Sequence, residues 1–243
     1  MPRTAAALVI GDELLSGKIQ DENVVFLGRE LFALGVRLRR VIMCPDDTAQ
    51  IARDVRALAA EHDMVFTSGG VGPTHDDVTM AALATAFGRK LVRSPEVEAM
   101  LRGFYRERIT EGHLRMASMP EGATLVRTAT IPWPIFVLEN VYVFPGVPEL
   151  FRMKFPALRE RLGSDAAYVT REIYTRLDEG EIAIALADVQ RAHPDVAIGS
   201  YPRWRDSVRR VKLTFDGTNL EAIERAVAAV LALLPADAVL PPP

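Results

Sequence analysis

The sequence predicts an α/β protein with a mostly parallel sheet covered by helices on both faces, followed by a small α+β module. Strand-like and helix-like segments alternate through roughly the first 160 residues, which is typical of right-handed βαβ units. A Gly-Ser-Asp segment at residues 163–165 then precedes a different order of elements. Apolar residues make up 49% of the chain, enough to fill the core of such a fold.

The first βαβ unit begins with a strand at residues 5–10. This is an apolar run without helical periodicity, as expected for a strand buried on both faces. The next helix is expected to begin at Asp21 or Glu22 and to end at Gly35, which suits a helix C-cap. Residues 36–43 then form the second strand.

Four further signals continue the alternation. Residues 46–48 provide caps for a helix, and residues 64–67 form a short apolar third strand. The glycine-rich segment 68–77 leads into a helix closed by Gly88. Ser-Pro-Glu at residues 94–96 opens another helix, with proline in its first turn.

The last elements of the first region are a hairpin at residues 137–144, turning at Glu139-Asn140, and a helix that follows the turn 145–148 and runs to about residue 162. This region is predicted to be one α/β domain at residues 1–163.

A small α+β module of βαββα order is predicted at residues 166–240. Its final helix is expected to open with a capping box formed by Thr218 and Glu221. Its elements are expected, in order, at residues 168–177, 180–192, 196–201, 208–215 and 218–234.

Composition excludes several classes of protein. The net charge is −3 and the isoelectric point about 5.9, so a basic nucleic-acid-binding face is not expected. The single cysteine, Cys44, excludes an intramolecular disulfide and fits a reducing compartment. Since no apolar stretch reaches membrane-spanning length, the expected location is cytoplasmic, without a membrane partner.

The expected ligand site lies beyond the carboxyl ends of the parallel strands, where open α/β sheets bind ligands. Four loops meet this description, at residues 11–20, 44–47, 68–77 and 145–148. They are therefore the candidate walls of the site.

The strongest local signal is the loop 68–77 between a buried strand and a helix. Glycines let backbone N–H groups approach an anion, and the start of a helix adds a positive dipole end. No Gly-Lys-Ser/Thr follows, so the loop is not a P-loop. It is suited to a phosphate-bearing ligand, with candidate binding residues Ser68, Gly69, Gly70, Val71, Gly72, Pro73 and Thr74.

Two aspartates, Asp76 and Asp77, end this loop and would repel a phosphate. A divalent cation such as Mg, Mn or Co would remove the conflict, because it takes carboxylate and phosphate oxygens together. The two aspartates are therefore candidate catalytic residues and, with Asp12, candidate metal ligands. The alternative is that one of them only caps the next helix. His75, beside them, is the one histidine in a candidate site.

The other three loops contribute further candidates, each with an ordinary alternative. Gly11, Asp12, Glu13 and Asn23 could bind a ligand or form a polar connection with helix caps. Asp46 could be catalytic, or it could cap a helix with its neighbour Asp47. Pro145, Gly146, Val147 and Pro148 could contact the ligand through backbone amides, or form a plain strand-to-helix turn.

Three segments together resemble the molybdopterin-binding family: GDELLSGKIQDEN at residues 11–23, GGVGPTHDDVT at 69–79 and FPGVPEL at 144–150. That family includes molybdenum-cofactor proteins of the MoaB/Mog type and the N-terminal domain of competence/damage-inducible protein CinA. With GSYPRW at 199–204, the narrower resemblance is to the molybdopterin-binding-like domain of eukaryotic FAD synthase, over nearly the whole chain.

This resemblance implies a three-layer α/β/α fold and a homo-oligomer, either a dimer or a trimer. It also implies one of two chemistries: binding or adenylylation of molybdopterin, or metal-dependent hydrolysis of a dinucleotide pyrophosphate such as FAD or ADP-ribose. Asp77 matches the acid that ends the family's glycine loop, and Asp46 the acid after the second strand. Asp76 stands where Mog-type proteins often have a basic residue, which favours the hydrolase.

The resemblance also limits the expected activity. The adenylyltransferase domain of FAD synthase and the amidohydrolase domain of CinA have no counterpart in these residues, so neither FAD synthesis nor nicotinamide-mononucleotide deamidation is expected. Three hypotheses remain: a divalent-metal-dependent nucleotide pyrophosphatase, a molybdopterin-binding or molybdenum-cofactor biosynthesis protein without hydrolase activity, and a regulatory module that binds a nucleotide without turnover.

Overall fold

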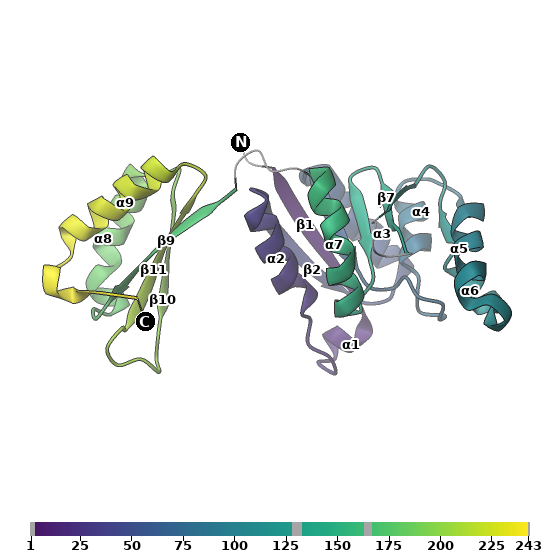
Figure 1. The fold of residues 1–243 in the computed structure, drawn as a ribbon, viewed down its shortest axis with the longest axis horizontal. Helices are drawn as coiled ribbons and strands as arrows, with labels where there is room; N and C mark the ends of the chain where they lie inside the picture. The colour runs from purple at the N-terminus through teal and green to yellow at the C-terminus, as the bar shows by residue number, and fades with distance from the viewer. Residues whose placement is uncertain (1–2, 128–132, 163–166, 243) are drawn as a thin grey trace. The chain divides into compact units, whose positions relative to one another are not determined.

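The computed structural model describes residues 3–127, 133–162 and 167–242. The chain divides into two compact units, Met1–Asp165 and Ala166–Pro243, which are described separately. Figure 1 shows their elements along the chain.

The described part of the first unit contains a six-stranded sheet of order β2-β1-β3-β8-β7-β6. The first four of these strands run parallel, while β7 and β6 pair antiparallel at one edge. This confirms the mostly parallel sheet and the hairpin predicted at residues 137–144. The bounds are β1 Thr4–Ile10, β2 Arg37–Cys44, β3 Met64–Ser68, β6 Thr124–Val126, β7 Ile135–Leu138 and β8 Val141–Phe144.

Helices cover both faces of this sheet, which confirms the three-layer arrangement (Figure 1). Alternate residues of a strand point to opposite faces, so Ala5 and Ala7 of β1 pack in one hydrophobic cluster and Ala6, Leu8 and Ile10 in the other. The first cluster includes α2 (Asn23–Ala33) and α7 (Pro148–Leu162), and the second includes α3 (Thr48–Glu61) and α4 (Thr79–Ala86).

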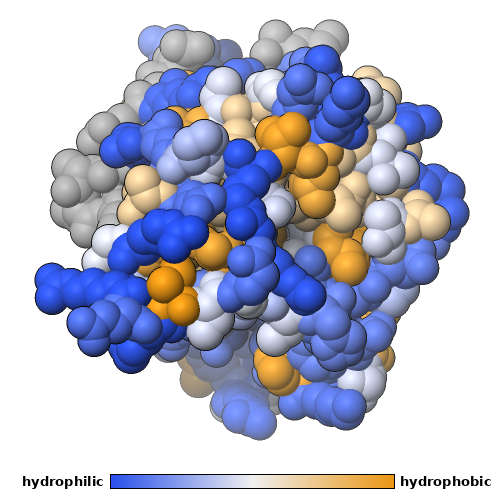
Figure 2. All heavy atoms as spheres, turned by 90° about the vertical axis from the view of Figure 1, so that its right-hand side faces the viewer, coloured by the Kyte–Doolittle hydropathy of each residue, from blue (hydrophilic) through white to orange (hydrophobic). Residues whose placement is uncertain are grey.

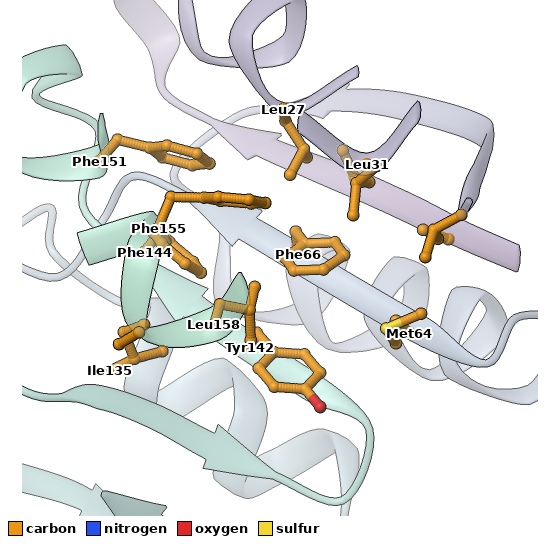
Figure 3. Close-up of a cluster of buried hydrophobic side chains, with 14 of the residues drawn as sticks. Leu27, Leu31, Met64, Phe66, Ile135, Tyr142, Phe144, Phe151, Phe155 and Leu158 are labelled. Atoms are coloured by element: carbon orange, nitrogen blue, oxygen red, sulfur yellow. The ribbon is translucent and has the colours of Figure 1, made fainter. Parts of the chain in front are cut away.

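Aromatic rings fill the layer between the sheet and the helices α2 and α7 (Figure 3). Phe144 of β8 lies 4.5 Å from Phe151 of α7, centroid to centroid. Phe66 of β3 stacks on Tyr142 of β8 at 5.3 Å. Since buried aromatic side chains contribute large apolar areas, this cluster fixes the start of α7 against the end of β8, beside the candidate site.

Local sequence signals set several helix ends as predicted. The Asp47 side chain accepts a hydrogen bond from Gln50 N at 2.7 Å and caps α3. Ser94 caps α5 (Pro95–Tyr105) in the same way, by accepting from Val97 N. Gly35 follows α2 with φ of 71°, a conformation that glycine adopts without strain.

Other details of the first unit were not predicted. The loop 11–20 contains a four-residue helix, α1 (Asp12–Leu15). The stretch after α4 carries the strand pair β4 (Leu91–Arg93) and β5 (Ser118–Pro120), the 3-10 helix η1 (Arg106–Arg108) and the helix α6 (Glu111–Arg115). Each is at most five residues long, too short to show a periodicity in the sequence.

The second unit is an antiparallel sheet of order β10-β11-β9-β12, in its described residues, with two helices packed on it (Figure 1). The predicted βαββα order is present, with an additional two-residue strand at the end. The elements are β9 Val169–Thr175, α8 Glu179–Ala192, β10 Ala197–Pro202, β11 Val211–Gly217, α9 Leu220–Leu233, η2 Ala236–Ala238 and β12 Val239–Leu240.

The predicted capping box at Thr218 and Glu221 is wrong. Asn219 is the N-cap of α9, and its side-chain oxygen accepts from Ala222 N at 3.1 Å. The helix therefore begins one residue later than expected, and Asn219 takes the role assigned to Thr218 because asparagine is at least as good a cap.

Across the described ranges, no helix has both the length and the apolar character needed to cross a membrane. Figure 2 views the face toward α5 and α6, where apolar side chains form several small groups separated by hydrophilic ones. The described residues on this face therefore form no single extended apolar surface.

Candidate functional site

The carboxyl ends of the four parallel strands bring the predicted loops together. Ile10 is in register with Cys44, Val9 with Ser68, and Ser68 with Phe144. A cleft of about 610 Å³ opens beyond these ends and is lined by residues of all four loops. The rule that ligands bind at this edge of a parallel sheet thus leads to a cavity of ligand size.

Glycine is required at two positions of the loop 68–77. Gly69 has φ of 110°, and a Cβ atom there would lie 2.2 Å from the carbonyl oxygen of Ile10. Gly70 has φ of 65°, and its Cβ would lie 2.4 Å from Thr79 Oγ1. The loop therefore packs directly on the first strand, as only a chain without side chains can.

Thr79, at the start of α4, fixes the loop by two hydrogen bonds. Its hydroxyl donates to Gly69 O at 2.9 Å and its backbone N–H to Gly70 O at 3.0 Å. The side chain is completely buried. The sequence analysis gave Thr79 no role, although its position ten residues after Gly69 at a helix start was a usable signal.

Several loop amides have no protein partner. Gly69 N donates to Phe144 O, and Thr74 N donates to the Asp77 carboxylate. Within the part of the chain that the structure describes, the N–H groups of Gly70, Val71 and Gly72 make no hydrogen bond, and all three residues line the cleft. Unpaired amides of this kind suit an anion.

Asp77 closes the loop on itself. One of its carboxylate oxygens accepts from Thr74 N at 2.7 Å and from Thr74 Oγ1 at 2.5 Å. The alternative that Asp76 or Asp77 caps the next helix is wrong, because Val78 occupies the N-cap of α4 and no side chain bonds there. Both aspartates line the cleft.

Asp76 and His75 are both exposed. The Asp76 carboxylate lies 3.9 Å from His75 Nδ1. The His75 side chain is 94% exposed and His75 does not line the cleft. A ligand-contact role for His75 therefore has no support in this arrangement.

The neighbours Asp46 and Asp47 have different roles. Asp47 caps α3, whereas Asp46 lines the cleft and accepts from Asp12 N at 3.0 Å. Burial raises the pKa of Asp46, and the charges of Glu13, Asp12 and Asp76 raise it further. Carboxylates from three loops thus lie close enough to repel one another.

The predicted metal ligands are gathered only in part. Asp76 and Asp77 line the cleft, but the Asp12 side chain is exposed and Asp12 contributes its backbone N–H to Asp46. Among the described residues, no three His, Cys, Asp or Glu side chains are grouped so that they could hold a metal ion. The repulsion at Asp46 favours a cation here, but a cation would need oxygens from the ligand to complete its coordination.

Asn23, at the start of α2, connects two of the predicted loops although it does not line the cleft. Its side-chain N–H groups donate to Ser68 Oγ at 2.9 Å and to Gly146 O at 2.8 Å. The residue is 3% exposed, and its side-chain oxygen is buried without a hydrogen-bond partner in the described residues. Asn23 is therefore a positioning residue for the loops.

The turn 145–148 passes close to the glycine loop. A Cβ atom on Gly146 would lie 3.3 Å from the Cα atom of Gly69. Pro145, Gly146, Val147 and Pro148 all line the cleft, and Val147 is 51% exposed. The strands β3 and β8 thus bring two glycine-containing turns together.

Sequence reasoning missed Lys154 and the apolar wall of the cleft. Lys154 lines the cleft, is 8% exposed and donates to Pro134 O at 3.0 Å. A signal was available, since Lys154 falls in the helical pattern of buried residues Phe151, Phe155 and Leu158. The apolar wall consists of Val97, Leu101, Tyr105, Met116, Trp133 and Phe136.

Fold and site together define a class of protein: an α/β domain with a glycine loop, beyond its parallel strands, whose amides are free to bind an anion. The chain belongs to the family described as the probable molybdopterin binding domain, which matches residues 6–163. Residues 167–243 match the family described as the FAD synthase middle domain. The resemblance seen in the sequence is thereby confirmed.

Known relatives extend this similarity. A protein from Archaeoglobus fulgidus is 36% identical over 218 residues, covering 90% of this chain and 92% of its own length. The probable FAD synthase of Caenorhabditis elegans is 33% identical over 259 residues, covering 96% of this chain but 50% of its own length. The chain thus spans about half the length of the nematode protein.

A solved structure shares the fold of the first unit. The crystal structure of CinA from Thermoplasma acidophilum, a protein described as of unknown function, matches with a TM-score of 0.61 and 28% identity. The match covers 66% of this chain and 98% of that one. The α/β fold is therefore that of CinA.

Proposed function

We propose that this chain binds a phosphate-bearing nucleotide or pterin in the cleft and hydrolyses a dinucleotide pyrophosphate such as FAD or ADP-ribose. One observation carries the proposal: the free amides of Gly70, Val71 and Gly72 line the same cleft as Asp46, whose pKa is raised. A cavity that contains both unpaired amides, which can bind an anion, and a cluster of acids fits a ligand with phosphates and a counter-cation.

The loop would contribute charge stabilisation. Its amides are held in place by the hydrogen bonds of Thr79 and by those between Thr74 and the Asp77 carboxylate. They therefore need little reorganisation when negative charge grows on a phosphate oxygen. Fixed donors of this kind stabilise such charge more effectively than mobile water.

The acids would contribute the second part of the chemistry. Asp76 and Asp77 would bind a divalent cation together with ligand oxygens that complete its coordination, and the cation would supply charge neutralisation and water activation. In the reaction, water adds to one phosphorus, the bridging P–O bond breaks, and two phosphate monoesters leave. Asp46, with its raised pKa, is suited to hold the proton lost by the water.

The test is incubation of the purified chain with FAD and with ADP-ribose, each with Mg, Mn or Co, followed by chromatography of the mononucleotides. We expect release of AMP that EDTA abolishes. Asp46→Asn should reduce the rate by about 10²- to 10⁴-fold, the range for a general acid–base group.

Asp47→Asn is the matched control, because Asp47 is the adjacent acid, caps α3 and does not line the cleft. Asparagine caps a helix as well as aspartate does, so this variant should keep full activity. Absence of mononucleotide release with every metal would rule out the hydrolase.

The alternative is a molybdopterin-binding or molybdenum-cofactor biosynthesis protein without hydrolase activity. It is favoured by one observation, that no three metal-binding side chains are grouped in the described residues. It predicts pterin binding that persists in EDTA, measured by calorimetry. Binding without turnover, and equal affinity with and without metal, would decide for it.

A further inference from the structure

The cleft wall has two chemically different parts. Six acids line the part formed by the strand-end loops and the first turns after them: Glu13, Asp21, Glu22, Asp46, Asp76 and Asp77. The other part is the apolar wall, in which Tyr105 and Trp133 contribute rings 6.5 Å apart, centroid to centroid. A ligand that fills the cleft must therefore have a polar end and an apolar end.

Lys154 is the only lysine or arginine among the described residues that line this cleft. Its Nζ atom donates one hydrogen bond, to Pro134 O, and has no carboxylate within 4.0 Å in the described part of the chain. Its helix neighbours Phe151, Phe155 and Leu158 belong to the hydrophobic core. The ammonium group is thus buried in apolar surroundings without a counter-charge.

Such a placement is unfavourable unless a ligand compensates it. Burial lowers the pKa of Lys154 to about 8, with no opposing contribution from an acid. An apolar side chain of similar length would fill the same space without losing the hydration of a charge. An ammonium has three donors, so two remain for a ligand after the bond to Pro134.

The ligand's phosphate is expected to bind away from Lys154, at the amides of the glycine loop. A hydrated phosphate does not suit the apolar wall, whereas a planar ring does, because the wall offers aromatic and aliphatic side chains for it to pack against. The group left to meet Lys154 is then an acceptor on the edge of that ring.

We propose that Lys154 recognises the ring of the ligand by donating to a carbonyl oxygen of a planar fused heteroaromatic system packed against the apolar wall. The cleft therefore selects a carbonyl-bearing ring, of flavin or pterin type, over adenine, whose ring carries no carbonyl. This inference rests on the proposed function in one respect, that the cleft binds a phosphate-bearing ligand.

The test compares FMN and AMP by calorimetry on the full chain. The two monophosphates share the phosphate and differ in the ring and in the sugar that carries it, which is ribityl in FMN and ribose in AMP. We expect the unaltered protein to bind FMN more tightly. Lys154→Met should weaken FMN at least tenfold and change AMP less than twofold. Lys154→Gln, which keeps a donor, should recover part of the FMN affinity.

Two controls keep the result interpretable. Arg159→Met removes an exposed cation from the same helix, one that pairs with Glu30 and does not line the cleft, and should leave both affinities unchanged. Without ligand, the Lys154→Met variant should melt a few degrees higher than the unaltered protein, because a desolvated charge has been removed. Weaker ligand binding by this variant would then not reflect unfolding.

Other outcomes overturn the proposal. Equal weakening of FMN and AMP by Lys154→Met would mean that Lys154 acts on the shared phosphate, and no effect on either would mean that it does not reach the ligand. In both cases the proposed function stands. If the unaltered protein binds neither probe, the proposed function fails first, and the ring subsite fails with it.

Discussion

Gly69 has a backbone conformation and a neighbour that exclude every side chain. Its positive φ and the 2.2 Å approach that a Cβ would make to the Ile10 carbonyl are both fixed by the packing of β3 on β1. The same contact places the following amides at the edge of the sheet. Gly69 thus links the packing of the strands to the position of the amides that can bind an anion.

We expect Gly69→Ala to destabilise the first unit by about 2–4 kcal/mol, because the added methyl group must displace backbone as well as adopt an unfavourable φ. Gly103→Ala in α5 is the matched control, since nothing lies within 4 Å of its Cβ position. It should be neutral or stabilising by up to about 1 kcal/mol. Urea unfolding measures both, and equal destabilisation would refute this account of Gly69.

The aspartates show how far a residue's role depends on its surroundings. Asp46 and Asp47 are adjacent and chemically identical, yet one lines the cleft and the other caps α3. Asp77 closes its loop through Thr74, while Asp76 is exposed. The predicted site acids are therefore not equivalent, and Asp46 is the one whose pKa is raised, chiefly by burial.

Among the elements, α7 combines two functions. Its face toward the sheet contributes Phe151, Phe155 and Leu158 to the core, and Lys154 on the same stretch lines the cleft. Because the aromatic cluster fixes α7 against β8, the ammonium of Lys154 is held in place by packing rather than by an ion pair. The sequence pattern of α7 predicts a helix that packs in the core, and the same helix also forms part of the site.

The helix α9 offers a test at the scale of an element. Asn219→Ala should destabilise the second unit by about 1 kcal/mol, because the N–H of Ala222 loses its acceptor. Thr218→Ala should change stability by less than about 0.5 kcal/mol, because Thr218 is exposed and precedes the cap. Thermal unfolding of both variants distinguishes this cap from the capping box expected from the sequence, which would reverse the order.

At the scale of the whole molecule, the chain has two units with separate hydrophobic clusters. Two clusters lie on the faces of the six-stranded sheet, and a third joins α8 and α9 to the antiparallel sheet. The glycine loop, the acids and Lys154 all belong to the first unit. The proposed chemistry therefore depends on the first unit, with the second supplying a fold of its own.

Since each unit has its own core, we expect calorimetry to resolve two unfolding transitions. FMN at about 100 times its Kd should stabilise one of them by about 2.7 kcal/mol, because it binds only the folded first unit. Asn219→Ala should lower the other transition alone. A single transition, or a ligand shift of both by the same amount, would contradict this assignment.

The sequence by itself determined the order of the longer strands and helices, the glycine loop and the edge of the sheet where a ligand is expected. These depend on local patterns: apolar runs of strand length, caps such as Asp47 and Ser94, and glycines after a buried strand. Their physical causes lie within a few residues of chain, so they can be read without a structure.

Only the tertiary structure decided which residues meet. Lys154 reaches the cleft, Asn23 joins Ser68 to Gly146, and Thr79 secures Gly69 because segments far apart in the chain pack together. Asp12 turned out to contribute its backbone N–H and not its carboxylate for the same reason. The direction and burial of a side chain are set by neighbours that the chain brings close only on folding, and a linear pattern does not contain them.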